Sequence, residues 1–118
     1  MLNNKADPNI CCVGESPLFI ASRHGRTEIV KLLLKNKADP NKCWVGKSPL
    51  YIASRHGCTE IVKLLLINKA DPNKCWEGES PLIIASRHGH TEIVELLLNN
   101  KADPNRCCAG MITLYTTS

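Results

Sequence analysis

The sequence predicts an all-α solenoid of stacked helix-turn-helix repeats with projecting loops, and three observations lead to this fold class. Ser-Pro-Leu begins at Ser16, Ser48 and Ser80, so the chain repeats itself every 32 residues. Each repeat carries the capping and apolar patterns of two short helices. Aromatic residues make up 4% of the chain beside 43% apolar residues, which favours thin aliphatic layers over one large core.

The repeats are nearly identical, so each copy should adopt the same fold. Residues 4–35 differ from residues 36–67 at 6 positions, and residues 36–67 differ from residues 68–99 at 6 positions. A helix pair of this size cannot bury its apolar face alone, whereas stacked copies form a continuous core. We therefore predict one repeat domain over residues 1–118, with repeats at about 14–45, 46–77 and 78–109 and partial repeats at both ends.

The first predicted helix of the middle repeat runs from Pro49 to about Arg55. Ser48 is a good N-cap, and Pro49 costs nothing at the first helical position because the N–H there has no helical partner. Gly57 supplies the left-handed conformation that ends such a helix.

The second predicted helix runs from Glu60 to about Ile67, with Thr59 as its cap. The acidic side chain of Glu60 suits the positive end of the helix. Apolar residues recur at helical spacing and predict one buried stripe, which consists of Ile61, Leu64 and Leu65 and is extended by Val62 and Leu66.

A loop follows the second helix in every repeat. Asn-Lys-Ala-Asp-Pro-Asn at residues 68–73 is rich in turn formers. Lys-Cys-Trp-Glu-Gly-Glu follows it and predicts a hairpin-like tip. Each unit is therefore a helix pair with a projecting loop.

Three sequence elements of the middle repeat resemble the ankyrin repeat family. These elements are Gly46-x-Ser48-Pro49-Leu50-x-x-Ala53, then Gly57-x-Thr59-Glu60-Ile61-Val62-Lys63-Leu64-Leu65-Leu66, then Ala70-Asp71 and Asn73. The family's elements are Gly-x-Thr-Pro-Leu-His-x-Ala-Ala, Gly-His-x-Glu-Val-Val-x-Leu-Leu-Leu and Gly-Ala-Asp-x-Asn. Matching sets begin at Gly14 and Gly78, so the resemblance covers nearly the whole chain. It implies the ankyrin scaffold and leaves the partner unspecified.

The sequence departs from the family in two places. The usual period is 33 residues, and the residue missing here lies between Asn73 and Gly78, which predicts a shorter loop tip. Phe19, Tyr51 and Ile83 replace the His that usually follows Pro-Leu. We expect apolar packing in place of the hydrogen bond that this His makes.

Arginine and histidine recur together at the end of each predicted first helix. This Arg-His ladder consists of Arg23, His24, Arg55, His56, Arg87 and His88. The resemblance implies that this position and the loop tips face a partner across a concave groove. A cationic stripe there would attract an acidic surface. Two other interpretations stand: the side chains merely complement the negative helix ends, or a recent duplication repeated them.

The loop tips supply the other candidate partner-binding residues. Trp44 and Trp76 occupy one tip position, and tryptophan is enriched at interface hot spots. The alternative is that these rings pack on neighbouring loops. The remaining candidates are Lys47, Glu77 and Glu79, because the tips vary on a constant frame.

The chain has 7 cysteines, an odd number, and reduced thiols are the expectation. Four share one repeat position: Cys11, Cys43, Cys75 and Cys107. Zinc needs ligands that converge at about 2.3 Å, and a disulfide needs Cα atoms within about 7 Å. Equivalent atoms of stacked repeats should lie about 10 Å apart, so we expect neither a metal site nor a disulfide within one chain. Cys12 and Cys108 are candidates for oxidation between molecules.

The sequence contains no catalytic motif, and we expect neither an enzyme nor a cofactor. The net charge of +4 is modest and interleaved with acids, which argues against nucleic-acid binding. Without an apolar leader or a membrane span, the expected location is intracellular, either cytoplasmic or nuclear. The expected function is a protein-interaction scaffold. The alternative is a fragment of a longer array that self-associates through uncapped ends, with apolar edges at Leu2 and at Ile112 or Leu114.

Overall fold

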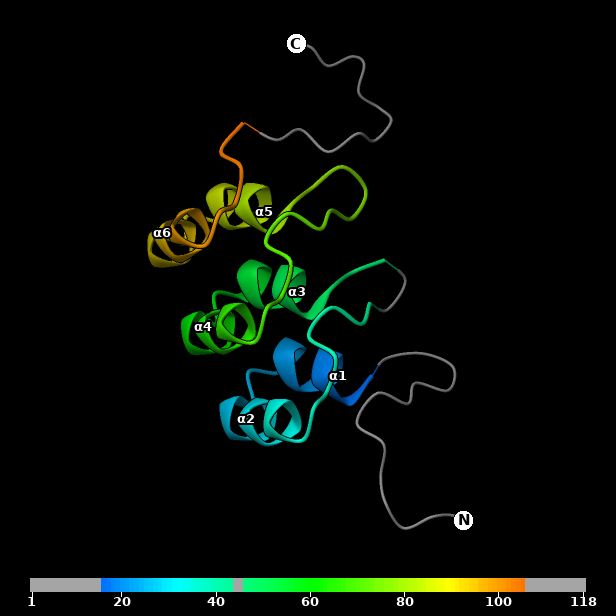
Figure 1. Cartoon of the computed structure of the whole chain (residues 1–118). Helices are drawn as coiled ribbons and strands as arrows, with labels where there is room; N and C mark the ends of the chain where they lie inside the picture. The colour runs from blue at the N-terminus through cyan, green and yellow to red at the C-terminus, as the bar shows by residue number, and fades with distance from the viewer. Residues whose placement is uncertain (1–15, 44–45, 106–118) are drawn as a thin grey trace.

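The computed structural model describes residues 16–43 and 46–105, which form six helices (Figure 1). In chain order these are α1 (Pro17–Arg23), α2 (Thr27–Lys35), α3 (Pro49–His56), α4 (Thr59–Ile67), α5 (Pro81–Arg87) and α6 (Thr91–Asn99). The predicted all-α class and the two helices of each repeat are confirmed. Among the described residues, no helix is long and apolar enough to cross a membrane.

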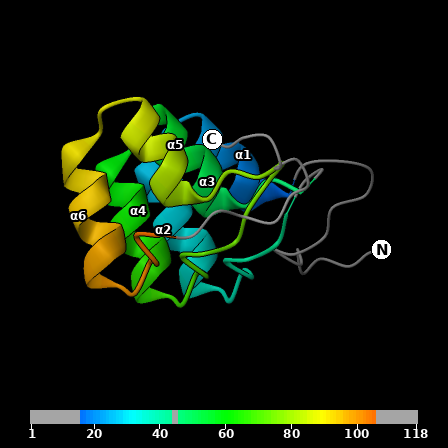
Figure 2. The ribbon, with the colours of Figure 1, turned by 90° about the horizontal axis from the view of Figure 1, so that it is seen from above.

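The helices form two layers that run along the array. Each first helix packs on the second helix of its own repeat, and α3 also packs on α1 and on α5. The second helices stack in the same way, with α4 between α2 and α6 (Figure 2). The loop between α4 and α5 projects past the layer of first helices, away from the second helices (Figure 1). First helices and loops therefore share one side of the molecule.

The core between the layers is aliphatic. Leu50, Ala53, Ile61 and Leu65 of the middle repeat are each 0% exposed. The predicted stripe of the second helix is buried as expected, apart from Leu64, which is partly buried and packs against the same core. Small aliphatic side chains fill the space between helices at this spacing, which accounts for the scarcity of aromatic residues.

The predicted N-caps of the first helices are confirmed. Ser48 Oγ accepts a hydrogen bond from Tyr51 N at 3.0 Å, and Ser16 and Ser80 make the equivalent bonds at 3.1 Å. Proline follows each serine at the start of the helix. Gly57 ends α3 with a φ of 75°, as predicted.

The predicted cap of the second helix is wrong. Helix α4 begins at Thr59, and Cys58 holds the N-cap position without a side-chain hydrogen bond. The backbone explains the difference, because Thr59 N donates to Gly57 O at 3.0 Å and Cys58 N donates to Ala53 O at 3.0 Å. This tight turn out of α3 already places Thr59 in the helix.

Each second helix is followed, after its asparagine C-cap, by a lysine in the left-handed region. Lys37, Lys69 and Lys101 have φ values of 72°, 75° and 78°. The family pattern has glycine at this position, where a side chain is strained. The preceding asparagine caps the helix: Asn68 Nδ2 donates to Leu64 O at 2.8 Å, and the other repeats do the same.

Candidate partner-binding surface

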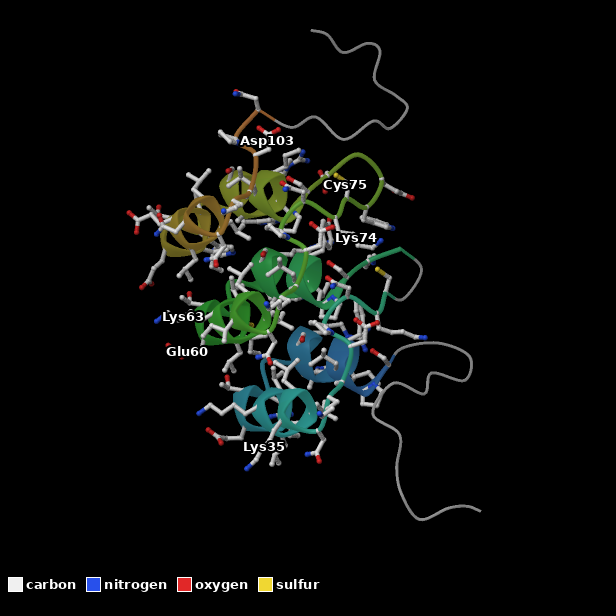
Figure 3. All side chains as sticks on the ribbon, in the orientation of Figure 1. Lys35, Glu60, Lys63, Lys74, Cys75 and Asp103 are labelled. Atoms are coloured by element: carbon white, nitrogen blue, oxygen red, sulfur yellow. The ribbon has the colours of Figure 1, made fainter. Side chains whose placement is uncertain are left out.

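The loop between α4 and α5 ends in a two-residue hairpin. Trp76 N donates to Glu79 O at 2.8 Å, and Glu79 N donates to Trp76 O at 2.9 Å. Glu77 and Gly78 between them have φ values of 48° and 82°, the positive pair that a type I′ turn requires. The predicted hairpin-like tip is confirmed for this loop. Because the loop projects from the stack, Lys74 and Cys75 lie far from Lys63, which lies on the layer of second helices (Figure 3).

Trp76 packs on the preceding loop of the array, which joins α2 to α3. A Cβ atom added at Gly46 would come within 2.9 Å of Trp76 Cδ1, so the indole lies directly over that glycine. The ring centroids of Trp76 and Tyr51 are 5.5 Å apart. Trp76 remains half-buried, so packing within the array uses part of its surface. Trp44 lies outside the described residues.

Tyr51 connects the middle repeat to the third repeat. Its hydroxyl donates a hydrogen bond to Glu79 Oε1 at 2.9 Å, and Arg87 Nη2 lies 2.8 Å from the other carboxylate oxygen. Burial and the bond to Glu79 raise the pKa of Tyr51 to about 12, against the opposing charge of nearby Arg55. The expectation that apolar packing replaces the family's histidine bond is therefore wrong for Tyr51, because its hydroxyl makes a hydrogen bond of its own. Phe19, at 1% exposed, packs as expected.

The middle repeat carries two cations where the third repeat has an ion pair. Lys47 occupies the repeat position of Glu79, and Arg55 occupies that of Arg87. The Nζ atom of Lys47 lies 4.6 Å from the centroid of the Trp76 ring, a cation–π contact. Positive charge therefore accumulates at this point of the surface.

The Arg-His ladder gathers along the C-terminal ends of the first helices. Arg23 stacks on Phe19, with its guanidinium carbon 5.9 Å from the ring centroid. Partial loss of hydration lowers the pKa of His56, and the charges of Arg55, Arg23, His24 and His88 lower it further. Ladder residues of all three repeats thus act on one histidine. The structure brings them together, and their contact with a partner stays a prediction.

The comparison with protein families identifies the scaffold. A family model described as ankyrin repeats, in three copies, matches residues 1–75 and 42–108. The chain belongs to the ankyrin repeat family. Ankyrin repeats are generally protein-interaction modules and are typically non-catalytic. No curated protein matches this sequence.

Asparagine side chains join the loops of this ankyrin array, a role that sequence reasoning missed. Asn41 Oδ1 accepts from Asp71 N at 2.7 Å, and Asn41 Nδ2 donates to Lys69 O at 3.4 Å. Asn73 makes the same two bonds to Asp103 N and Lys101 O, at 2.9 and 3.3 Å. The signal in the sequence is the asparagine that recurs at this position, in a segment that turn formers alone also explain. The bridges hold the bases of successive loops in register.

The cysteines of the ankyrin loops differ in state. Cys43 and Cys58 are free and half-buried, and burial raises the pKa of both thiols. Cys75 is disulfide-bonded, so the prediction that this ladder forms no disulfide is wrong. The spacing rule applies to packed helices, whereas Cys75 lies on a loop that leaves the layers. Cys12 and Cys108 lie outside the described residues. Among those described, no group of three or more His, Cys, Asp or Glu could hold a metal ion.

Apolar side chains are exposed on the two end faces of the ankyrin stack. Ile29 and Leu32 of the first repeat are 48% and 58% exposed, whereas the equivalent Ile61 is 0% exposed. On the third repeat a hollow of about 610 Å³ is lined by Leu82, Ile83, Ser86, Arg87, Val94, Leu98, Asp103 and Pro104. The predicted edges at Leu2, Ile112 and Leu114 lie outside the described residues.

Proposed function

We propose that this ankyrin array is a non-enzymatic scaffold that binds another protein through its loop tips and first helices. The observation that carries the proposal is that the Arg-His ladder and the loop hairpin lie on one side of the stack. The second helices form the outer layer of the stack. Their Lys31 and Lys63 pair with acids of the same helix, with 3.4 Å between Nζ and a carboxylate oxygen of Glu28 and of Glu60. The first helices, which carry Arg55, lie on the side of the stack from which the loop projects (Figure 1).

Charge and aromatic surface give this side its expected preference. Arg23 and Arg55 place positive charge along the first helices, which favours a partner with an acidic surface and speeds association. Trp76 offers an anchor of the type found at interface hot spots, with part of its surface packed within the array. Glu77 at the exposed tip would limit which acidic partners fit, because like charges repel.

An array of acidic, neutral and basic peptides tests the proposal. We expect the chain to be retained on acidic peptides, and the double variant Arg23→Glu, Arg55→Glu to lose most of that retention. The matched control is Lys31→Glu, Lys63→Glu, which changes the net charge equally on the outer helices. Equal losses in both double variants, or no retention on any series, would refute a binding face on the loop side.

Self-association is the second candidate function, favoured by the exposed apolar residues of the end faces. Ile29 and Leu32 on one face and Leu98 on the other would stack as their buried equivalents do within the array. Light scattering distinguishes this candidate. An increase in mass with concentration, abolished by Leu32→Lys, would support it, and a monodisperse monomer at all concentrations would contradict it.

A further inference from the structure

We infer that Lys47 and Arg55 form a binding site for a carboxylate side chain of the partner protein. This inference rests on the proposed function and assigns its central contact. The partner is then a protein whose docking segment presents Asp or Glu to the middle repeat. Three observations lead to it.

The third repeat already contains such a contact within the chain. The carboxylate of Glu79 lies 2.8 Å from Arg87 Nη2, and Glu79 precedes Arg87 by 8 residues. Lys47 precedes Arg55 by the same 8 residues, and both helices begin with the same serine cap and proline. The arginine at this repeat position therefore pairs with a carboxylate in the third repeat. In the middle repeat, Lys47 occupies the position of Glu79, so the chain supplies no carboxylate from that position.

Arg55 has no carboxylate partner within residues 16–43 and 46–105. Glu79 shares the Tyr51 side chain with Arg55 as an interaction partner, and its two oxygens are engaged separately, one by the Tyr51 hydroxyl and one by Arg87. Arg55 acts on the neighbouring Tyr51 through its charge and by hydrogen bonding. Its guanidinium presents five donors, which match the two oxygens of a carboxylate.

Lys47 supplies the second charge at a fixed place. Its ammonium lies over Trp76, whose ring is held by Gly46 and Tyr51. A lysine positioned in this way loses less side-chain freedom on binding than an unrestrained one. Arg55 also adds to the positive field that, after burial, lowers the pKa of His56. A bound carboxylate would oppose this field.

Reciprocal charge exchanges test the site with a fluorescein-labelled hexaglutamate peptide and anisotropy titration at low salt. Lys47→Glu gives the middle repeat its own carboxylate, which should pair with Arg55 as Glu79 pairs with Arg87. We expect a loss of affinity of about tenfold, as for the loss of one good charge contact. Glu79→Lys should create a second site with Arg87 and raise the affinity several-fold.

Two controls separate the site from the effect of net charge and from misfolding. Lys63→Glu changes the net charge as Lys47→Glu does, but on the outer face, and should alter the affinity less than twofold. Lys47→Gln removes the charge without adding an acid and should show an intermediate loss. Far-ultraviolet circular dichroism should give the same helix content for all variants. In NMR titrations, saturating peptide should raise the pKa of His56.

The outcomes distinguish this inference from the proposed function. If Lys47→Glu and Lys63→Glu weaken binding equally, the peptide responds to net charge alone and the site is wrong. If Lys47→Glu has no effect while Arg23→Glu, Arg55→Glu still abolishes retention on acidic peptides, the carboxylate site is wrong and the scaffold proposal stands. If none of these variants changes retention, both are refuted.

Discussion

The hydroxyl of Tyr51 in the middle repeat donates a hydrogen bond to the carboxylate of Glu79 in the third, over 2.9 Å. The equivalent residues of Tyr51 are Phe19 and Ile83, which have no hydroxyl, so this polar link belongs to one interface of the array. The ring itself is 1% exposed, and the bond satisfies its buried oxygen. The same carboxylate lies 2.8 Å from Arg87 Nη2, so Glu79 joins Tyr51 of the middle repeat to Arg87 of the third.

The ionisation of Tyr51 reports this link. Its pKa is raised to about 12, first by burial and then by Glu79, so the folded state disfavours the phenolate. The stabilisation is complete below pH 10, the ordinary tyrosine value, and is lost as the pH rises toward 12. Ultraviolet titration of tyrosinate should show this late transition, absent from Tyr51→Phe. Glu79→Gln should move it to lower pH without restoring the ordinary value, because burial remains. Because the chain has a second tyrosine, Tyr115, the signal of Tyr51 is the difference between the unchanged protein and Tyr51→Phe. A difference transition at pH 10 would contradict the link.

Much of the fold could be predicted because each local signal occurs three times. The Ser48 cap, the Pro49 start and the Gly57 end are properties of adjacent residues, and the apolar stripe of α4 follows from helical spacing. The structure begins α4 at Thr59, one residue before the predicted start. The backbone bonds of the preceding turn place Thr59 in the helix, so its side chain does not cap it. Sequence pattern does not predict those backbone bonds.

The contacts of the candidate surface could not be predicted, because they join residues that occupy different positions of the repeat. Tyr51 meets Glu79, 28 positions later, and not the equivalent residue 32 positions later. Asn41 likewise bridges to the backbone of Lys69 and Asp71. The repeat period indicates which residues are equivalent, whereas loop geometry decides which of them touch.

Replacing Ser54 by alanine should stabilise the protein. Its hydroxyl is 0% exposed and has no hydrogen-bond partner, so folding removes it from water without compensation. Ser54→Ala should raise the free energy of unfolding by about 1 kcal/mol in urea denaturation. Ser86→Ala is the matched control, since Ser86 is the equivalent residue and is exposed. Equal effects of the two substitutions would contradict an unsatisfied hydroxyl at Ser54.

Replacing Lys69 by glycine should also stabilise the protein. Lys69 has a φ of 75°, which costs an L-residue about 1–2 kcal/mol, whereas glycine adopts it freely. After the entropy of glycine in the unfolded chain is subtracted, Lys69→Gly should raise the free energy of unfolding by about 0.5–1 kcal/mol. The same exchange at Lys63, inside α4, should lower it by about 1 kcal/mol. Loss of stability in both variants would show that the Lys69 side chain makes a contact worth more than the strain.

Replacing Gly57 by alanine should cost more than the same change at Gly89. Both glycines have left-handed backbones, with φ values of 75° and 73°. A Cβ at Gly57 would approach His90 Cε1 to 2.8 Å, whereas a Cβ at Gly89 meets no atom within 4 Å. The His90 ring, which hydrogen-bonds Arg55 O through Nε2 at 3.2 Å, must then move.

The difference between these two variants measures that contact. Gly89→Ala should lower the free energy of unfolding by about 1–2 kcal/mol through backbone strain alone. Gly57→Ala should lower it by about 1 kcal/mol more, because the interrepeat bond to Arg55 O is also lost. In a His90→Ala background the added loss should vanish, since no ring remains to clash. If Gly57→Ala is as mild as Gly89→Ala in the presence of His90, the ring does not pack on Gly57.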